Sequence, residues 1–160
     1  MTSQDTVDRL LAHFSEALHI SPPLSLNQTG VCAFGYGDGI SIAIEVPEQS
    51  SQLYLIGTVC SRLPERGTQL LELYESLLKL NLFSSELRGA SVAVDPDTED
   101  ILLCYQHPIA AIDETAFYNL LTQFTQTVEA LRVKLGQSAA ATPIGEPLAL
   151  ETSQFFSQRA

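Results

Sequence analysis

Residues 77–106 read LLKLNLFSSELRGASVAVDPDTEDILLCYQ, and this stretch decides the fold class. Its leucines belong to a helix predicted from Thr68 to about Leu87, and Gly89 closes that helix region because glycine adopts the left-handed conformation at low cost. Two apolar runs follow, residues 90–95 and 101–106, which have the composition of strands. The acidic turn DPDTED separates them. The stretch therefore predicts a helix followed by two strands, with no side chain placed for chemistry.

Upstream of this stretch the hydrophobic pattern has a period of two. Apolar side chains alternate with small or polar ones, and they are Ile40, Ile42, Ile44 and Val46. This alternation is typical of a half-buried antiparallel strand. The runs VCAFGY and QLYLIGTVCSRL lie on either side of it, and each is separated from it by residues of turn composition. Three strands in a meander are therefore predicted between Leu24 and Leu63.

A helix is predicted at each end of the domain. The first carries one apolar stripe at helical spacing, formed by Val7, Leu10, Leu11, Phe14 and Leu18. Thr2 and Asp5 have the spacing of a capping box, so this helix should begin near Ser3, and Ser21-Pro22-Pro23 should end it. The last helix should be capped by Asp113, run over residues 116–135 and end at Gly136. Its apolar stripe is Phe117, Leu120, Leu121, Phe124, Val128, Leu131 and Leu135.

Together these elements predict the α+β class, with a twisted antiparallel sheet of about five strands and three helices in the order α-β-β-β-α-β-β-α. The length of 160 residues fits one domain. Residues 1–136 should form that domain. Residues 137–160 are rich in Ala, Ser, Thr, Pro and Gln, and we expect a flexible C-terminal tail with a docking segment at 148–156.

The chain is acidic, with 19 Asp and Glu against 8 Lys and Arg and a formal net charge of −11. Nucleic acids and anionic membranes are therefore not expected as partners, because both are bound through clustered Lys and Arg. The N-terminal residues lack the basic start and apolar core of a signal peptide, and no apolar run is long enough to span a bilayer. Three separate cysteines, Cys32, Cys60 and Cys104, are typical of buried free thiols. A cytoplasmic location is expected.

Each candidate for chemistry has a simpler structural explanation. GYGDG, residues 35–39, precedes a strand rather than a helix, so a hairpin turn is favoured over a phosphate loop. Cys104 and His107 lack further zinc ligands and should point to opposite faces of a strand. DPDTED lacks the glycine and final glutamate of a calcium loop. His13 and His19 have no cluster of carboxylates near them in the sequence and should lie at the surface. We therefore predict no catalytic residue, no metal site and no cofactor.

The feature without a simple explanation is an excess of apolar side chains. The helix at 70–83 is apolar on more than one side, and the predicted strands carry large side chains on both faces. One small sheet covered on one side cannot bury all of them. The surplus predicts a homodimer seam, a hydrophobic docking surface, or both, and the alternative is a well-filled core in a monomer.

The order of elements and several sequence words resemble the class I type III secretion chaperones over residues 3–135. LLKLNLFSSELRGASVAVDPDTEDILLCYQHPI is similar to that family's leucine-rich helix ending in Leu-x-x-Asn, its glycine before the fourth strand, its Asp-Pro turn and its apolar fifth strand. FYNLLTQFTQTVEALRVKL resembles the family's last helix, although Leu131 stands near the place of a common tryptophan. These are small acidic cytosolic homodimers of Gram-negative bacteria that escort effector proteins to the secretion apparatus.

The resemblance implies three kinds of partner: a second copy of the chain, one or more secreted effectors and, as a further candidate, the ATPase of the secretion apparatus. In the family an extended effector segment near the N-terminus wraps around the dimer without nucleotide. The predicted dimer interface is Leu73, Leu77, Leu80 and Leu82. The predicted client groove is lined by Phe14, Leu18, Phe34, Tyr36, Ile42 and Ile44. A shift of one residue in strand parity would exchange the groove residues for their neighbours.

Two other functions fit the residues. The first is a small-molecule-binding or sensory α+β domain without catalytic activity, which would retain a ligand on purification where a chaperone would retain a protein. The second is an enzyme that depends on Cys104 or Cys60. Replacing either cysteine would abolish the activity of such an enzyme and leave a chaperone functional.

Overall fold

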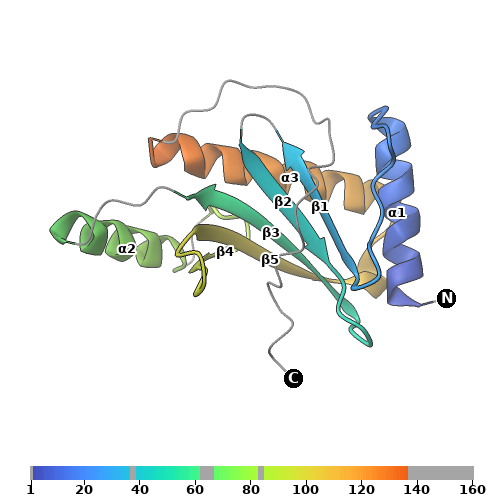
Figure 1. The fold of residues 1–160 in the computed structure, drawn as a ribbon, viewed down its shortest axis with the longest axis horizontal. Helices are drawn as coiled ribbons and strands as arrows, with labels where there is room; N and C mark the ends of the chain where they lie inside the picture. The colour runs from blue at the N-terminus through green and yellow to red at the C-terminus, as the bar shows by residue number, and fades with distance from the viewer. Residues whose placement is uncertain (1, 37–38, 62–66, 83–84, 137–160) are drawn as a thin grey trace.

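The computed structural model describes residues 2–36, 39–61, 67–82 and 85–136. These residues form a five-stranded antiparallel sheet with three α-helices and one short 3-10 helix, η1 (Figure 1). The predicted α+β class and the predicted order of helices and strands are confirmed. The elements are α1 (Ser3–Ala17), β1 (Val31–Tyr36), β2 (Ile40–Glu45), β3 (Gln52–Cys60), α2 (Thr68–Leu80), β4 (Ser91–Val94), β5 (Ile101–Pro108), η1 (Ile109–Ala111) and α3 (Glu114–Lys134).

Helix α1 begins where its capping box predicts. The Thr2 hydroxyl accepts a hydrogen bond from the Asp5 amide at 3.1 Å, and the Asp5 carboxylate accepts one from the Thr2 amide at 2.6 Å. These bonds satisfy two of the amides that a helix N-terminus leaves without intrahelical partners. The side chains of α1 that the structure buries are Val7, Leu10, Leu11, Phe14 and Ser15. The apolar stripe thus faces the core as predicted, except that Leu18 lies just beyond the helix and is half-buried.

Strands β1, β2 and β3 form the predicted antiparallel meander. Phe34 lies opposite Ile42, and Ile42 lies opposite Gly57, so these residues share one face of the sheet. A Cβ atom at Gly57 would stand 2.5 Å from Cγ2 of Val128 in α3. Glycine at this position therefore allows α3 to pack closely against β3.

The second part of the sheet is not in sequence order. Strand β5 lies between β3 and β4, so the order across the sheet is β1-β2-β3-β5-β4. The turn between β4 and β5 is held by Asp95, whose carboxylate accepts hydrogen bonds from the amides of Asp97 at 2.7 Å and Thr98 at 3.1 Å. Because β1 and β4 come first and last in the strand order, they are the two edge strands of the sheet.

Helix α2 is shorter than the sequence predicts, ending at Leu80 rather than near Leu87. The reason is the side chain of Asn81, which pairs with the backbone of Val92 in β4. It donates to the Val92 carbonyl at 3.1 Å and accepts from the Val92 amide at 2.7 Å. The helix gives way at Asn81, and the described residues that follow it, 81–82 and 85–89, are turns.

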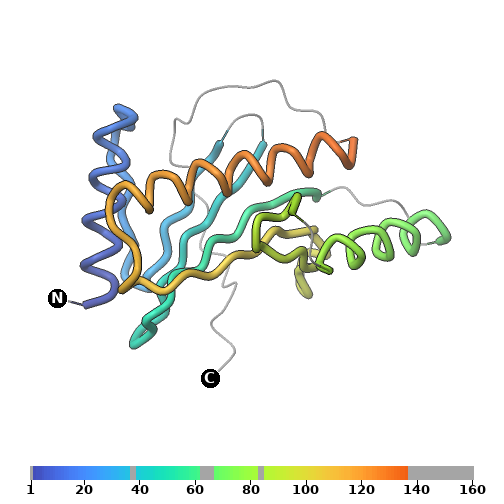
Figure 2. Tube along the Cα trace, turned by 180° about the vertical axis from the view of Figure 1, so that it is seen from behind, coloured from blue at the N-terminus to red at the C-terminus, as the bar shows by residue number. Residues whose placement is uncertain are grey.

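Helices α1 and α3 lie on the same face of the sheet, as both views show (Figures 1 and 2). The Asp113 carboxylate caps α3 by accepting a hydrogen bond from the Ala116 amide at 2.8 Å, and Gly136 follows the helix with a positive φ of 73°. Phe14 and Phe117 pack edge to face, with ring centroids 6.2 Å apart. Helix α2 contacts β4 and projects from the end of the sheet away from α1 (Figure 1).

Candidate partner-binding surfaces

Most side chains predicted to line a client groove lie in the core instead. Phe14 is 2% exposed, Phe34 is 1% exposed, and Ile42 and Ile44 are fully buried. The prediction that these four side chains line an open groove is corrected. The apolar faces of β1 and β2 are turned towards the chain's own helices, which cover them. Leu18 and Tyr36 are half-buried and pack against the edge of the same core.

Tyr36 lies at the open end of β1 on the helical side of the sheet. Burial, and after it the negative charge of Glu129 in α3, raise the pKa of Tyr36 above its usual value. The hydroxyl is therefore neutral at physiological pH and can donate a hydrogen bond. Tyr36 is the one residue of the predicted strand set that keeps partial exposure.

The outer edge of β1 has free backbone groups. The Gly30 carbonyl accepts a hydrogen bond from the Val46 amide at 2.8 Å, so the even-numbered residues of β1 pair with β2. Val31 bonds outward to Asn27, with its carbonyl accepting from the Asn27 amide at 2.8 Å. By the alternation of an antiparallel ladder, the N–H and C=O groups of Ala33 and Gly35 also point outward. Within the described part of the chain these groups have no partner, so β1 presents an unpaired strand edge.

The opposite edge of the sheet is closed where β1 is open. At Val92, in the middle of β4, both outward backbone groups are bound by the Asn81 side chain. An amide side chain offers one donor and one acceptor, which matches the two groups of a strand residue. A polypeptide adding to the sheet would thus meet free groups at β1 and an occupied position at β4.

Helix α2 carries leucines on two opposite sides. Leu77 is 4% exposed and packs in the core, and Leu73 and Leu80 are half-buried against it. On the other side, Leu71, Leu78 and Leu82 are 69%, 68% and 71% exposed. We call these three residues the exposed α2 stripe. Of the predicted dimer-interface residues, only Leu82 belongs to it.

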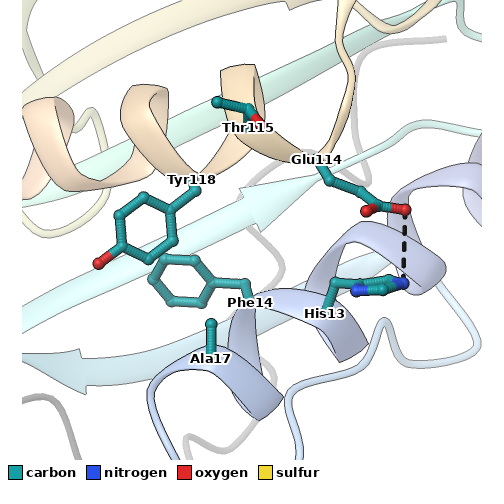
Figure 3. Close-up of a pocket in the computed structure, with 6 residues that line it drawn as sticks. All are labelled: His13, Phe14, Ala17, Glu114, Thr115 and Tyr118. Carbon is teal, nitrogen blue, oxygen red and sulfur yellow. Dashed lines mark ion pairs between the residues drawn. The ribbon is translucent and has the colours of Figure 1, made fainter.

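A shallow hollow lies between the C-terminal half of α1 and the first turns of α3, and we call it the α1–α3 pocket. Its volume is about 270 Å³. The residues that line it are His13, Phe14, Ala17, Glu114, Thr115 and Tyr118 (Figure 3). The rings of Phe14 and Tyr118 form one part of the lining, with centroids 5.6 Å apart. No pattern in the sequence indicated this pocket, because α1 and α3 are about a hundred residues apart and no motif links them.

The other part of the pocket is polar. Oε1 of Glu114 lies 3.2 Å from Nη1 of Arg9 and 3.4 Å from Nε2 of His13. His13 is at the surface as predicted, but it does have a carboxylate beside it, contributed by a distant segment. All three side chains are about half exposed, so the Arg9–Glu114 ion pair is weak in water, and His13 forms an ion pair with Glu114 only when its ring is protonated.

The described residues show no cluster of His, Cys, Asp and Glu suited to a metal ion. No helix among them is long and apolar enough to cross a membrane. None of the three cysteines forms a disulfide; Cys32 and Cys60 are buried and Cys104 is half-buried. Burial raises the pKa of the Cys32 thiol to about 11 and also raises that of Cys104. Neither thiol is therefore activated as a nucleophile at neutral pH.

Comparison with known proteins finds one family. Residues 9–132 match the model of the Tir chaperone protein (CesT) family. The comparison with curated proteins finds no match. The family match covers most of α1, the whole sheet and nearly all of α3.

Solved structures share the fold at low sequence identity. A chain of the ExsC-ExsE complex is similar with a TM-score of 0.71 and 20% identity, over 83% of this chain and 96% of that one. A chain of the HopA1-SchA chaperone-effector complex is similar with a TM-score of 0.63 and 17% identity, over 82% and 96%. A third is from the complex of the Yersinia pestis type III secretion chaperone SycH with a YscM2 fragment, with a TM-score of 0.55 and 22% identity, over 78% and 98%.

Proposed function

The chain belongs to the Tir chaperone protein (CesT) family, and we propose that it is a type III secretion chaperone for one or more effector proteins. It binds an extended segment near the effector's N-terminus, keeps that segment soluble and competent for secretion, and delivers it to the secretion apparatus. The family match over residues 9–132 is the observation that carries this proposal. Similar folds in solved complexes, among them one described as chaperone-effector, support it.

The free edge of β1 is where we place the backbone of the client. An extended segment that adds a strand there can bond to the outward N–H and C=O groups of Ala33 and Gly35. Such backbone bonds do not depend on the client's sequence, so they suit a protein with several clients. Of the six side chains predicted to line the groove, Leu18 and Tyr36 remain candidates for contact with the client's side chains.

The exposed α2 stripe is where we place the dimer interface. Leu71 and Leu78 lie two turns apart on one side of α2, Leu82 follows in the turn after the helix, and each is about 70% exposed. Val94 in β4, the strand that α2 contacts, is a further exposed apolar residue, at 43%. Exposed leucines in a row are costly in water and are typical of a self-association surface. A dimer formed through α2 would have two β1 edges, one from each copy, to which a single client could bind.

The remaining parts of the proposal follow from family membership. The chain acts by binding alone, in the cytoplasm of a Gram-negative bacterium, and the secretion-apparatus ATPase is a further candidate partner. Residues 1–136 are proposed as the chaperone domain. The predicted tail, residues 137–160, and its docking segment lie outside the described residues.

The test uses the bacterium that encodes the chain. A tagged copy is captured while type III secretion is active, the bound proteins are identified, and their secretion is compared with and without the gene. We expect at least one bound protein to be a secreted effector, held through its N-terminal segment, whose secretion is lost on deletion and restored by the intact gene. Unchanged secretion of every bound protein would contradict the proposed function.

A further inference from the structure

The size of the α1–α3 pocket favours a side chain over a free ligand. Its volume of about 270 Å³ is below the range of about 300–1,000 Å³ that is usual for small-molecule sites. The pocket is also open to solvent, and its lining residues come from both helices (Figure 3). A segment of polypeptide lying over this opening could insert one side chain.

The apolar part of the pocket can shelter one hydrophobic side chain. The Phe14 ring is 2% exposed and lies at the base, while Tyr118 is 37% exposed at the rim. Ala17 lies on the α1 side of the same rings (Figure 3). An aliphatic or aromatic side chain placed here would remove exposed aromatic carbon from water, which is favourable in proportion to the area covered.

The polar part of the pocket can accept a positive charge. Both Arg9 and His13 reach the same atom of Glu114, Oε1. Within the described part of the chain, Oε2 of Glu114 has no hydrogen-bond partner, although a carboxylate oxygen can accept two hydrogen bonds. A second cation can therefore bind Oε2 while Arg9 stays in place. Asp113 adds a second negative charge at the start of α3, in a chain whose net charge is −11.

We infer that the α1–α3 pocket is a specificity site for a client segment that has an apolar residue next to a Lys or Arg. The apolar side chain lies over Phe14, Ala17 and Tyr118, and the basic side chain bonds to Glu114. This inference rests on the proposed function, because it concerns which client segments the chaperone prefers. Pairing at the β1 edge does not depend on sequence, so discrimination between clients has to come from side-chain contacts of this kind.

The probe is a set of three synthetic eight-residue peptides of serine and glycine. The first contains Leu-Arg at its centre, the second Leu-Glu, and the third Ser-Arg. Each is titrated into the full ¹⁵N-labelled chain and followed by NMR up to about 5 mM, which reaches affinities as weak as millimolar. We expect the Leu-Arg peptide to shift the amide signals of Ala17, Thr115 and Tyr118. It should bind about threefold to fivefold tighter than Leu-Glu, as for an exposed ion pair, and the Ser-Arg peptide should bind more weakly still.

One variant of α3 tests the pocket and a second is its matched control. The test variant, Glu114→Gln, keeps the shape of the pocket and should remove the preference for Leu-Arg over Leu-Glu. Glu129→Gln makes the same change about 22 Å further along α3 and should leave that preference intact. No shift at the three pocket amides, or equal binding of Leu-Arg and Leu-Glu to the wild type, would overturn the inference. Because effector capture and secretion are measured separately, that result would leave the proposed function standing.

Discussion

Helices α1 and α2 both carry large apolar side chains and are of similar length, 15 and 13 residues, but they bury very different fractions of those side chains. In α1 the four apolar residues of the stripe, Val7, Leu10, Leu11 and Phe14, are at most 2% exposed. In α2 only Leu77 is buried, and Leu71 and Leu78 are more than two-thirds exposed. A helix with one apolar stripe can bury that stripe against its own chain, whereas a helix with a second apolar side leaves that side exposed for contact with another molecule.

The positions of the two helices explain this difference. Helix α1 packs against α3 and η1 on the covered face of the sheet, so its stripe is enclosed. Helix α2 contacts β4 at the end of the sheet, where only one side of a helix can be covered (Figure 2). If the two regions differ in function as they do in burial, substitutions in α1 should act on stability and substitutions on the exposed side of α2 should act on association.

The largest expected effect is on the packed region. Leu11→Ala should lower the free energy of unfolding by about 2–5 kcal/mol, because Leu11 is fully buried and the substitution leaves a cavity. The same substitution at Leu71 should change the stability of the monomer by less than about 0.5 kcal/mol. Urea denaturation measures both, at a protein concentration low enough for the wild type to be monomeric. A similar loss in both variants would show that Leu71 packs within its own chain.

The next effect is on self-association. Leu78→Asp should weaken the dimer by about 2–3 kcal/mol, or roughly a hundredfold, because a charge would replace a leucine that the proposed interface buries. Sedimentation equilibrium measures the dissociation constant, and circular dichroism should show a folded chain.

Two controls on α2 sharpen this prediction. Ser76→Asp adds the same charge on another side of the helix and should leave the dimer intact. Leu77→Asp should unfold the domain, because Leu77 is in the core of the monomer. If Leu78→Asp sediments as wild type does, the dimer interface lies elsewhere.

The packed region should also show a pH dependence that arises at Cys32. Burial, assisted by the negative charge of Asp8, raises the pKa of this thiol from 9.0 to about 11, although the Ser25 amide opposes the shift. The folded chain therefore holds the proton more tightly than the unfolded chain does. The stabilisation is complete below pH 9 and is lost as the pH rises towards 11, by about 2 kcal/mol.

Chemical denaturation at several pH values between 8 and 11 measures this slope, and Cys32→Ala should flatten it. Cys104→Ala is the matched control and should keep the steep part of the slope, since Cys104 is only half-buried. Identical slopes in wild type and Cys32→Ala would mean that another group is responsible.

The smallest expected effect is at the open edge of the sheet. Ala33→Pro removes one outward N–H and should weaken client binding by about 0.5–1.5 kcal/mol while the fold persists, because proline is tolerated on an edge strand. Ala43→Pro makes the same change on the inner strand β2 and should destabilise the sheet itself. Calorimetric titration with the effector segment found by capture measures the first effect. If a folded Ala33→Pro chain bound the client with wild-type affinity, the client's backbone would not pair with β1 at this position.

Local patterns in the sequence were sufficient for α1, for the β1–β3 meander and for α3. The capping box at Thr2, the alternation from Ile40 to Val46 and the stripe from Phe117 all depend on residues that are close in the chain. The end of α2 could not be predicted in this way, because it depends on Asn81 bonding to Val92, which lies in a strand further along the chain. The family resemblance rested on the order of the elements, on residues 77–109 and on the sequence of the last helix taken together, and the family is confirmed.

The candidate site was harder to predict than the fold. The sequence shows that β1 and β2 each have an apolar face, but it does not show whether a helix of the same chain or a client covers that face. Phe34, Ile42 and Ile44 were predicted to line the client groove, but in the structure their side chains are buried in the core. The α1–α3 pocket had no signal at all, since His13 and Glu114 meet only when the two helices pack.

The sequence by itself determined which segments are helices or strands, the acidic charge, and the surplus of leucine near residue 77, because these depend on composition and short-range periodicity. Only the tertiary structure decided that β5 lies between β3 and β4, that β1 has the open edge, and which side of α2 is exposed. These properties depend on which surfaces the chain covers with its own distant segments. Hydrophobic burial is non-directional. An apolar stripe therefore indicates that it will be covered, but it does not indicate whether the same chain or another molecule covers it.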